Sequence, residues 1–315
     1  MKTFRDLTTE QQTNLFTQVK GLKTSGLGYK KIIKKLITEQ QIRLSQGTLS
    51  YWFNNEVKLL GGENTFEPKS SPELAYILGV MFGDASKFNY KKKQDYFLAL
   101  GVKDKDFAEK FSQCGAKIVG KQKPFAVTEL SPPGFSKMYY TRIRGKKLFN
   151  FVKEIKEDFE KAKPFIEEFP AEFIRGLADS EGSAIGCSSS GKLNFKVDVA
   201  NSANLKLLEY TQDLLLKKYG IESSLRKSKT AGVQDSIING RIITRTKDLF
   251  LLQVRKFKSI VKYSEFIDFT IFRKKQKLLD GIFLLSSFTR KEAFRIWQNF
   301  MKRKKLFGWQ KLKNK

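Results

Sequence analysis

One pattern that occurs twice constrains the fold of this 315-residue chain more than any other feature. Residues 77–85 and residues 174–182 both begin apolar, carry small residues four positions apart and reach an acid, Asp84 in the first and Glu181 in the second. The small residues are Gly79, Gly83, Gly176 and Ser180. This spacing places them on one face of a helix, and glycine there costs about 1 kcal/mol relative to alanine unless a close contact compensates. The pattern therefore predicts that the two helices pack together and bring both acids side by side.

The same succession of elements follows each segment. After the first, periodic patterns predict a strand, a helix, two strands and a helix at residues 95–102, 105–114, 125–130, 137–144 and 146–159. After the second, they predict the same order at residues 194–200, 204–219, 223–229, 249–254 and 259–269. We therefore expect an α+β fold of two pseudo-symmetric αββαββα halves, whose antiparallel sheets form a saddle with helices on one face and a polar, basic other face.

Composition divides the chain into five regions. Residues 1–60 are helical in pattern, and residues 61–72 are rich in turn formers, as a linker is. The two halves occupy residues 73–165 and 166–285, and a basic tail follows at residues 286–315. For the tail we expect an apolar helical side that docks and basic side chains that add phosphate contacts.

The second half is longer because residues 233–246 are inserted. Within the insertion Asn239-Gly240 separates two apolar runs, which is typical of a hairpin with a type I′ turn. We therefore expect a two-stranded hairpin there.

The first region has the pattern of a small all-α helix-turn-helix domain. Ser45 is a good N-cap for its second helix. We expect Gln46, Thr48 and Ser50 on the helix that enters a DNA groove, with Tyr51 near them. The predicted core residues are Ile32, Leu49 and Trp52. The alternative is a small helical bundle that only packs on the body.

Charge and composition narrow the function. The net charge of +28 indicates a polyanionic partner, most often nucleic acid. The chain has no histidine, which excludes Ser-His-Asp and Cys-His catalysis. Cys114 and Cys187 are too few for a disulfide framework, and no apolar run has the length of a membrane span or signal peptide. We expect an intracellular protein in which carboxylates and a hard divalent cation carry any nuclease chemistry.

The paired segments resemble those of the LAGLIDADG homing endonucleases in their monomeric, two-repeat form, over residues 73–285. The resemblance implies a metal site of Mg²⁺ or Mn²⁺ at Asp84 and Glu181 together with Ala85 and Gly182. It implies a monomer that hydrolyses phosphodiester bonds of both DNA strands across the minor groove. Its partner would be double-stranded DNA with a long, partly asymmetric target.

The family also places a catalytic lysine just past the first long strand of each half. Lys103 matches in the first half, whereas residues 201–203 of the second half contain no basic residue. This departure predicts that the two DNA strands are cut at unequal rates. Ala85 stands where the motif usually has glycine, and alanine is less tolerant of a tight turn.

The strands supply candidate DNA contacts. Apolar Phe195, Val197 and Val199 alternate with polar residues, as on a strand with one buried face. Two-stranded β elements fit the major groove, where every base pair is distinguishable. The candidate contacts are Asn194, Lys196, Asp198, Arg226, Tyr140, Arg142 and Arg144.

Two other classes of function use the same scaffold. One is an intron RNA maturase, for which intron RNA is the partner, and the other is a DNA-binding regulator. A resolvase or transposase lacks support, because the sequence has no nucleophilic serine motif or three-acid cluster, and Asp179 is interpreted as structural or as a minor metal neighbour. We expect a free-standing, intron-encoded protein that is cytoplasmic and nucleoid-associated, or organellar if an organelle encodes it.

Overall fold

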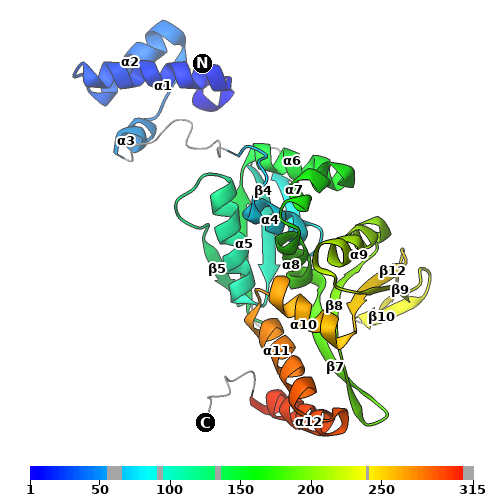
Figure 1. The fold of residues 1–315 in the computed structure, drawn as a ribbon. Coiled ribbons are helices and arrows are strands. Elements are labelled where there is room, and N and C mark those ends of the chain that lie inside the picture. The colour runs from blue at the N-terminus through cyan, green and yellow to red at the C-terminus, as the bar shows by residue number, and fades with distance from the viewer. Residues whose placement is uncertain (55–65, 91–94, 132–135, 239–240, 308–315) are drawn as a thin grey trace. The chain divides into compact units, whose positions relative to one another are not determined.

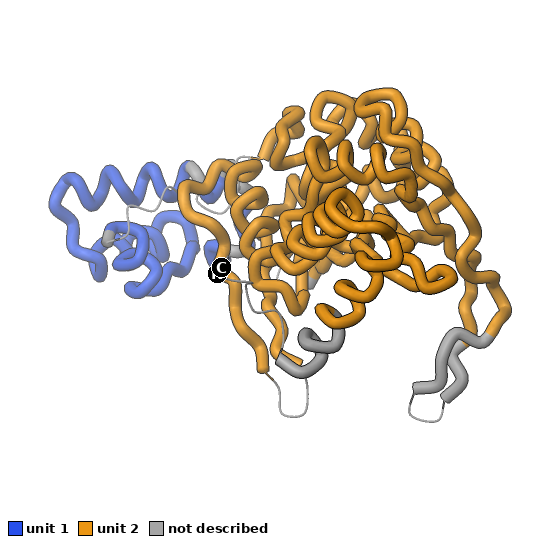
Figure 2. The backbone as a smooth tube through the Cα atoms, turned by 60° about the horizontal axis from the view of Figure 1, so that its bottom comes forward, with its two compact units in different colours: residues 1–65 blue, residues 66–315 orange. Residues whose placement is uncertain are grey.

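The structure is a computed structural model that describes residues 1–54, 66–90, 95–131, 136–238 and 241–307 (Figure 1). The chain forms two compact units, Met1–Thr65 and Phe66–Lys315 (Figure 2). Within the described residues, no helix has both the length and the apolar character needed to cross a membrane.

Unit 1 is a helical unit with its own apolar core. Its helices are α1 (Thr9–Thr24), α2 (Tyr29–Gln40) and α3 (Gln46–Asn54), with a short 3-10 turn at Phe4–Asp6. Strand β1 (Lys2–Thr3) pairs in parallel with β2 (Ile42–Arg43). Ile32, Leu49 and Trp52 are buried as predicted. The Ser45 hydroxyl accepts a hydrogen bond from the Thr48 N–H at 3.0 Å, which makes Ser45 the cap of α3.

The first half of unit 2 is an αββαββα succession. Its elements are α4 (Pro72–Met81), β3 (Ser86–Tyr90), β4 (Asp95–Val102), α5 (Lys105–Ile118), β5 (Val127–Leu130), β6 (Met138–Arg144) and α6 (Lys146–Glu157). The strands form an antiparallel sheet in the order β3-β4-β6-β5. Helix α4 begins inside the predicted linker, where the Ser71 hydroxyl accepts from the Leu74 N–H at 3.1 Å.

The second half repeats that succession with an added hairpin. Its elements are α8 (Pro170–Glu181), β7 (Ser183–Ser189), β8 (Lys192–Ser202), α9 (Leu205–Tyr219), β9 (Ser224–Lys229), β10 (Gln234–Ile238), β11 (Arg241–Thr244), β12 (Leu249–Val254) and α10 (Phe257–Phe266). Its four-stranded antiparallel sheet has the order β7-β8-β12-β9, and β10 pairs with β11. The predicted turn at Asn239-Gly240 lies outside the described residues.

These two sheets and their helices confirm the α+β fold class. A 3-10 turn (Phe159–Ala162) and α7 (Lys163–Glu167) join the halves, and α11 (Phe272–Ser287) and α12 (Arg290–Phe307) follow them. Figure 1 shows α4 and α8 adjacent at the centre of unit 2. The strand positions given by the sequence patterns omit β3 and β7. Both are rich in polar or small residues and form by pairing with β4 and β8, so they lack the apolar alternation that marks a strand.

The start of the basic tail is a docked helix. Trp297 of α12 is buried, and its ring lies 5.5 Å from that of Phe195 on β8 in an edge-on arrangement. Gly186 of β7 provides the space, because a Cβ atom there would lie 2.4 Å from the indole. Helix α12 therefore covers the helix-side face of the β7–β8 pair.

Candidate metal and nucleic-acid site

Helices α4 and α8 approach each other at backbone distance. A Cβ atom on Gly79 would lie 2.2 Å from the carbonyl oxygen of Phe173, and one on Gly176 would lie 2.3 Å from that of Tyr76. Real side chains do not tolerate such distances, so the small residues are what allows this contact. The small residues on one face of each helix therefore allow α4 and α8 to pack against each other, as their spacing predicts.

The two acids lie where this helix pair ends. A Cβ atom on Gly83 would lie 2.3 Å from Ser180 Cβ and 3.3 Å from Glu181 Cγ, so the end of one segment touches the end of the other. Glu181 is the last residue of α8 and is half-buried. Asp84 is exposed and follows a turn rather than the helix predicted at its position, because α4 ends at Met81.

Loss of hydration disfavours the charged form of both acids, and repulsion by Asp84 adds to this effect at Glu181. Partial burial raises the pKa of the Glu181 carboxyl, the charge of Asp84 raises it further, and Lys274 opposes both effects. Asp84 is exposed as a residue, but desolvation by the surrounding atoms still raises the pKa of its carboxyl; Lys274 lowers this pKa, and Asp104 raises it. Two carboxylates that repel each other in a partly desolvated place are stabilised by a cation between them.

The acid pair fits a hard divalent cation that also binds a phosphate. Among the residues that the structure describes, no cluster of three or more histidine, cysteine or acidic side chains could hold a metal ion. Mg²⁺ needs no such cluster, since it is commonly held by one or two carboxylates with phosphate oxygens and water. Asp84 and Glu181 supply the carboxylates.

Ala85 and Gly182 follow the two acids, and their backbone conformations correct the expectation that alanine is poorly suited to this position. Gly182 has an extended backbone, with φ −88° and ψ 166°, so its glycine is not needed for a turn. A Cβ atom there would lie 2.7 Å from the carbonyl oxygens of Ala178 and Val199, so the need is for space beside β8. Ala85 is buried, and it is not among the described non-glycine residues with positive φ. Alanine at this position is therefore unstrained.

The third acid of the region, Asp179, is a structural residue. It is buried and accepts hydrogen bonds from the Tyr76 hydroxyl at 2.8 Å and from the backbone N–H of Thr270 at 3.0 Å. It thereby ties α4 to the chain entering α11. Both of its side-chain oxygens already accept hydrogen bonds, which leaves Asp84 and Glu181 as the candidate site.

Sequence analysis missed one cation beside the pair. Lys274 of α11 is buried, and its ammonium donates to the carbonyl oxygens of Ala178 (3.0 Å) and Asp179 at the end of α8. Burial lowers the pKa of Lys274 to about 8, although nearby acids oppose this shift. Its charge acts on both Asp84 and Glu181. In the sequence it is one of 60 lysines and arginines, and nothing in its neighbourhood marks it.

The candidate lysine, Lys103, lies directly after β4 and is exposed. The next residue, Asp104, accepts two hydrogen bonds from the guanidinium of Arg273, at 2.7 and 2.8 Å. At the corresponding end of β8, Asn201 instead accepts from the Ser228 hydroxyl at 3.3 Å. The halves therefore differ in charge where each first long strand ends.

The second sheet carries a polar network on the face opposite the helices. Asp198 lies 3.6 Å from the ammonium of Lys196 and accepts from the Gln253 amide. The Gln253 side-chain oxygen accepts from Arg226 at 3.1 Å and from Arg255 at 2.9 Å. The predicted contact residues Lys196, Asp198 and Arg226 therefore belong to one network of hydrogen bonds and an ion pair. Gln253 and Arg255 complete it, and the sequence analysis did not predict either residue as a contact. Asn194 lies further along β8, is exposed and pairs in register with Cys187.

The first sheet presents an aromatic and arginine cluster. The guanidinium of Arg142 lies 4.9 Å from the ring centroids of both Phe97 and Tyr140, and its Nε donates to the Tyr140 hydroxyl at 2.9 Å. Arg144 is exposed and lies 3.5 Å from Asp95. All three predicted contacts of β6 therefore share one face, because they alternate along the strand.

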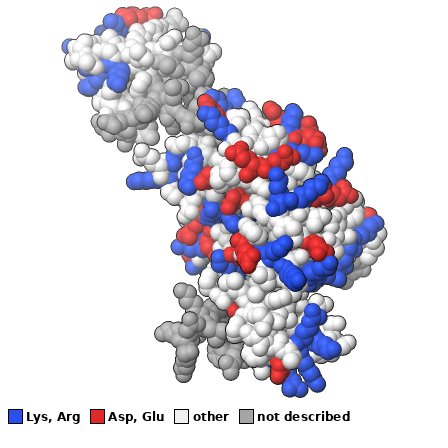
Figure 3. Space-filling view, viewed as in Figure 1, with Lys and Arg blue, Asp and Glu red and all other residues white. Residues whose placement is uncertain are grey.

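Charge of both signs covers the upper part of unit 2 in the view of Figure 3. Most of the visible surface at the lower end is uncharged, with a group of basic side chains on its right side. The exposed basic residues of α12 and β8 include Arg290, Lys291, Arg295 and Lys192. Such side chains attract a polyanion.

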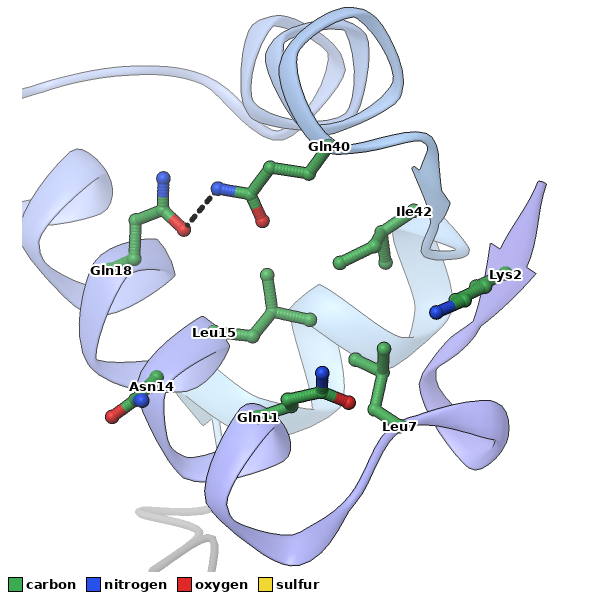
Figure 4. A pocket seen from close by; sticks show the side chains of 8 residues that line it. All are labelled: Lys2, Leu7, Gln11, Asn14, Leu15, Gln18, Gln40 and Ile42. Atoms are coloured by element: carbon green, nitrogen blue, oxygen red, sulfur yellow. Dashed lines mark hydrogen bonds between the residues drawn. The ribbon is translucent and has the colours of Figure 1, made fainter.

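Unit 1 has a separate set of polar residues. Gln46 is exposed at the start of α3, and Thr48 and Ser50 are half-buried on it. Tyr51 is exposed. Elsewhere in the unit a pocket of about 330 Å³ is lined by four amide side chains around Leu15, and the Gln40 amide donates to Gln18 at 2.8 Å (Figure 4). No acid lines this pocket, so it offers no catalytic carboxylate.

Part of the second half is similar to a known domain family. Residues 168–250, a segment that includes Glu181, match the LAGLIDADG-like domain family. An uncharacterised protein of Methanocaldococcus jannaschii is 29% identical over 88% of this chain and 96% of its own length. The ATP-dependent DNA helicase Hel308 of the same organism is 33% identical over 45% of this chain, and the match spans 11% of the helicase.

Solved structures with a similar arrangement include two homing endonucleases. I-DmoI in complex with DNA and Mn is 19% identical, with a TM-score of 0.40, over 62% of this chain and 96% of that one. I-WcaI bound to its DNA recognition sequence is 13% identical, with a TM-score of 0.44, over 70% of this chain and 92% of that one.

Proposed function

We propose that this protein is a site-specific, metal-dependent DNA endonuclease that hydrolyses phosphodiester bonds in both strands of a long target. The observation that carries the proposal is the convergence of Asp84 and Glu181 at the joined ends of two helices packed backbone to backbone. The match of residues 168–250 to the LAGLIDADG-like domain family supports it.

The chemistry follows from the acid pair. A bound Mg²⁺ or Mn²⁺ would activate water and stabilise the leaving oxygen of an in-line displacement. Asp84 and Glu181 would hold the cation, with the backbone at Ala85 and Gly182 next to it. Their repulsion favours the loaded state, since each carboxylate is easier to ionise beside a cation. Lys103 would orient the attacking water on the first-half side.

The sheets and unit 1 would bind the DNA. The Arg142 cluster presents an arginine that can pair with the edge of guanine. Gln253 is itself buried, and it would orient the exposed side chains of Arg226 and Arg255 for the same kind of contact. Helix α3 of unit 1 would add contacts in a neighbouring groove. Because both halves lie in one chain, we propose that a monomer is sufficient.

The decisive experiment is selection of cleavage sites from a random DNA library with Mg²⁺. We expect one long preferred site for the unmodified protein. Asp84→Asn and Glu181→Gln should each lower cleavage by about 100-fold or more while leaving DNA affinity within about threefold, because they remove metal ligands and not the DNA surface. Glu209→Gln, which changes an exposed acid of α9, is the matched control. Selective binding of DNA or intron RNA without cleavage by the unmodified protein would instead indicate a regulator or a maturase.

Unequal cutting of the two strands is a second expectation. Only the first half carries a lysine directly after its long β-strand, so the two DNA strands would face different charges. In a time course on a supercoiled plasmid containing the selected site, nicked circles should accumulate before linear DNA. Lys103→Met should slow one strand by about 10-fold more than the other. Equal rates for both strands in the unmodified protein would contradict this asymmetry.

A further inference from the structure

The first turn of α11 and the residues directly before it contact both halves beside the acid pair. On the first half, Arg273 donates two hydrogen bonds to the carboxylate of Asp104, and the Phe272 N–H donates to Asp106 at 2.6 Å. A paired guanidinium and carboxylate fix direction as well as distance. Because Asp104 directly follows Lys103, this pair holds the loop that carries the candidate lysine.

On the second half, the same segment donates hydrogen bonds to the end of α8. The Thr270 N–H donates to Asp179 at 3.0 Å, and the Lys274 ammonium donates to the carbonyl oxygens of Ala178 and Asp179. These carbonyls lie in the last turn of the helix that ends at Glu181. Lys274 is buried, so loss of its partners would leave an uncompensated charge.

We propose that Arg273 and Lys274 are positioning residues for the nuclease: together they set the Lys103 loop of the first half against the Glu181 end of the second. Two consecutive residues do this because neighbours on a helix point in different directions, one toward each half. The inference rests on the proposed function and adds the requirement that α11, which follows the second αββαββα succession, holds the site together. The bracket, defined as residues 270–274, therefore makes the site depend on a segment beyond the repeated elements.

The test separates binding from chemistry. Arg273→Gln and Lys274→Met should each lower the single-turnover cleavage rate by about 10- to 100-fold, because small displacements of reacting groups cost that much. DNA affinity, measured with Ca²⁺, should stay within about threefold, since neither side chain belongs to the proposed DNA surface, and the Mg²⁺ concentration for half-maximal rate should rise. The matched control is Lys275→Met, which removes the neighbouring lysine and its ion pair with Asp268 and should change none of these three quantities.

A charge exchange tests the geometry itself. Asp104→Arg should slow cleavage as Arg273→Gln does, and combining Asp104→Arg with Arg273→Asp should recover at least about threefold of the lost rate. The proposal is overturned if the single variants cleave at the unmodified rate. It is also overturned if rate and affinity fall together and the exchange restores nothing, because that pattern is general destabilisation.

A readout that does not depend on cleavage keeps this inference separate from the proposed function. Amide hydrogen exchange should accelerate at residues 103–106 in Arg273→Gln and at residues 178–182 in Lys274→Met, with no change in Lys275→Met. If the unmodified protein cuts no DNA but these changes appear, the nuclease assignment fails and the bracket stands as a structural device. Unchanged exchange in both segments overturns the bracket whatever the protein does to DNA.

Discussion

At the scale of single residues, the ionised carboxylates of Asp84 and Glu181 destabilise the folded protein when no cation is bound. Desolvation raises the pKa of both carboxyl groups, so the folded state binds protons more readily than the unfolded state does. Stability from this source is therefore greatest at low pH and is lost as the pH rises from the ordinary carboxyl value through the raised one. Such a cost is expected at a site built to receive a positive charge.

Glu181→Gln should accordingly stabilise the metal-free protein at neutral pH. Without the repelled charge, we expect the melting temperature at pH 7 to rise by about 1–3 °C. The gain should vanish near pH 4, where the carboxyl of the unmodified protein is protonated as well. Added Mg²⁺ should raise the melting temperature of the unmodified protein but not that of the variant. Scanning calorimetry at both pH values gives the comparison, and a gain that persists at low pH would contradict the electrostatic origin.

At the scale of elements, the α4–α8 pair holds the site together, and its glycines are the vulnerable positions. Gly176→Ala would place a methyl group 2.3 Å from the carbonyl oxygen of Tyr76, which neither backbone can avoid without separation of the helices. We expect a loss of about 3 kcal/mol or more in the free energy of unfolding of unit 2, at or above the usual cost of overpacking. Urea unfolding measures this value.

Gly101→Ala is the control for that prediction. Its added methyl group would meet the ring of Tyr140 at 3.4 Å and the side chain of Met138 at 3.9 Å, both of which are ordinary packing distances. A change within about 1 kcal/mol is expected there, since the contact is that of normal packing. Equal effects of the two substitutions would show that the helices do not depend on close approach.

The same helix pair shows what can be predicted from the sequence. The spacing of small residues and the apolar periodicity predicted α4 and α8, because each segment by itself carries the small residues that the helix-to-helix contact needs. Strands β3 and β7 were missed because their apolar signal is weak and a partner strand creates them. Lys274 was missed for a related reason: its role depends on α8, which is far from it in sequence. Gln253 acquires its role in the same way, through three different strands.

At the scale of the whole molecule, charge and domain organisation would determine how this protein holds DNA. The net charge of +28 is spread over both units, and each unit has its own apolar core. Binding of a polyanion by such a surface releases counterions, so affinity falls steeply with salt. If unit 1 binds phosphates, its share of the affinity should be separable from that of unit 2, which carries both acids.

Removal of residues 1–65 tests that separation. We expect the remaining chain to keep its acid-dependent cleavage, because α4, α8 and the bracket all belong to unit 2. Its affinity should fall by about 10-fold or more at moderate salt, and the slope of log affinity against log salt should become shallower by about 0.9 for each phosphate that unit 1 neutralises in the full chain. Fluorescence anisotropy across a salt series measures both values, with the full chain as reference.

Gln46→Ala in the full chain should weaken binding to the selected site more than to random DNA, because a base contact discriminates between sequences and a phosphate contact does not. An unchanged salt slope after the removal would mean that unit 1 does not touch the DNA, and α3 would then be only a packing helix.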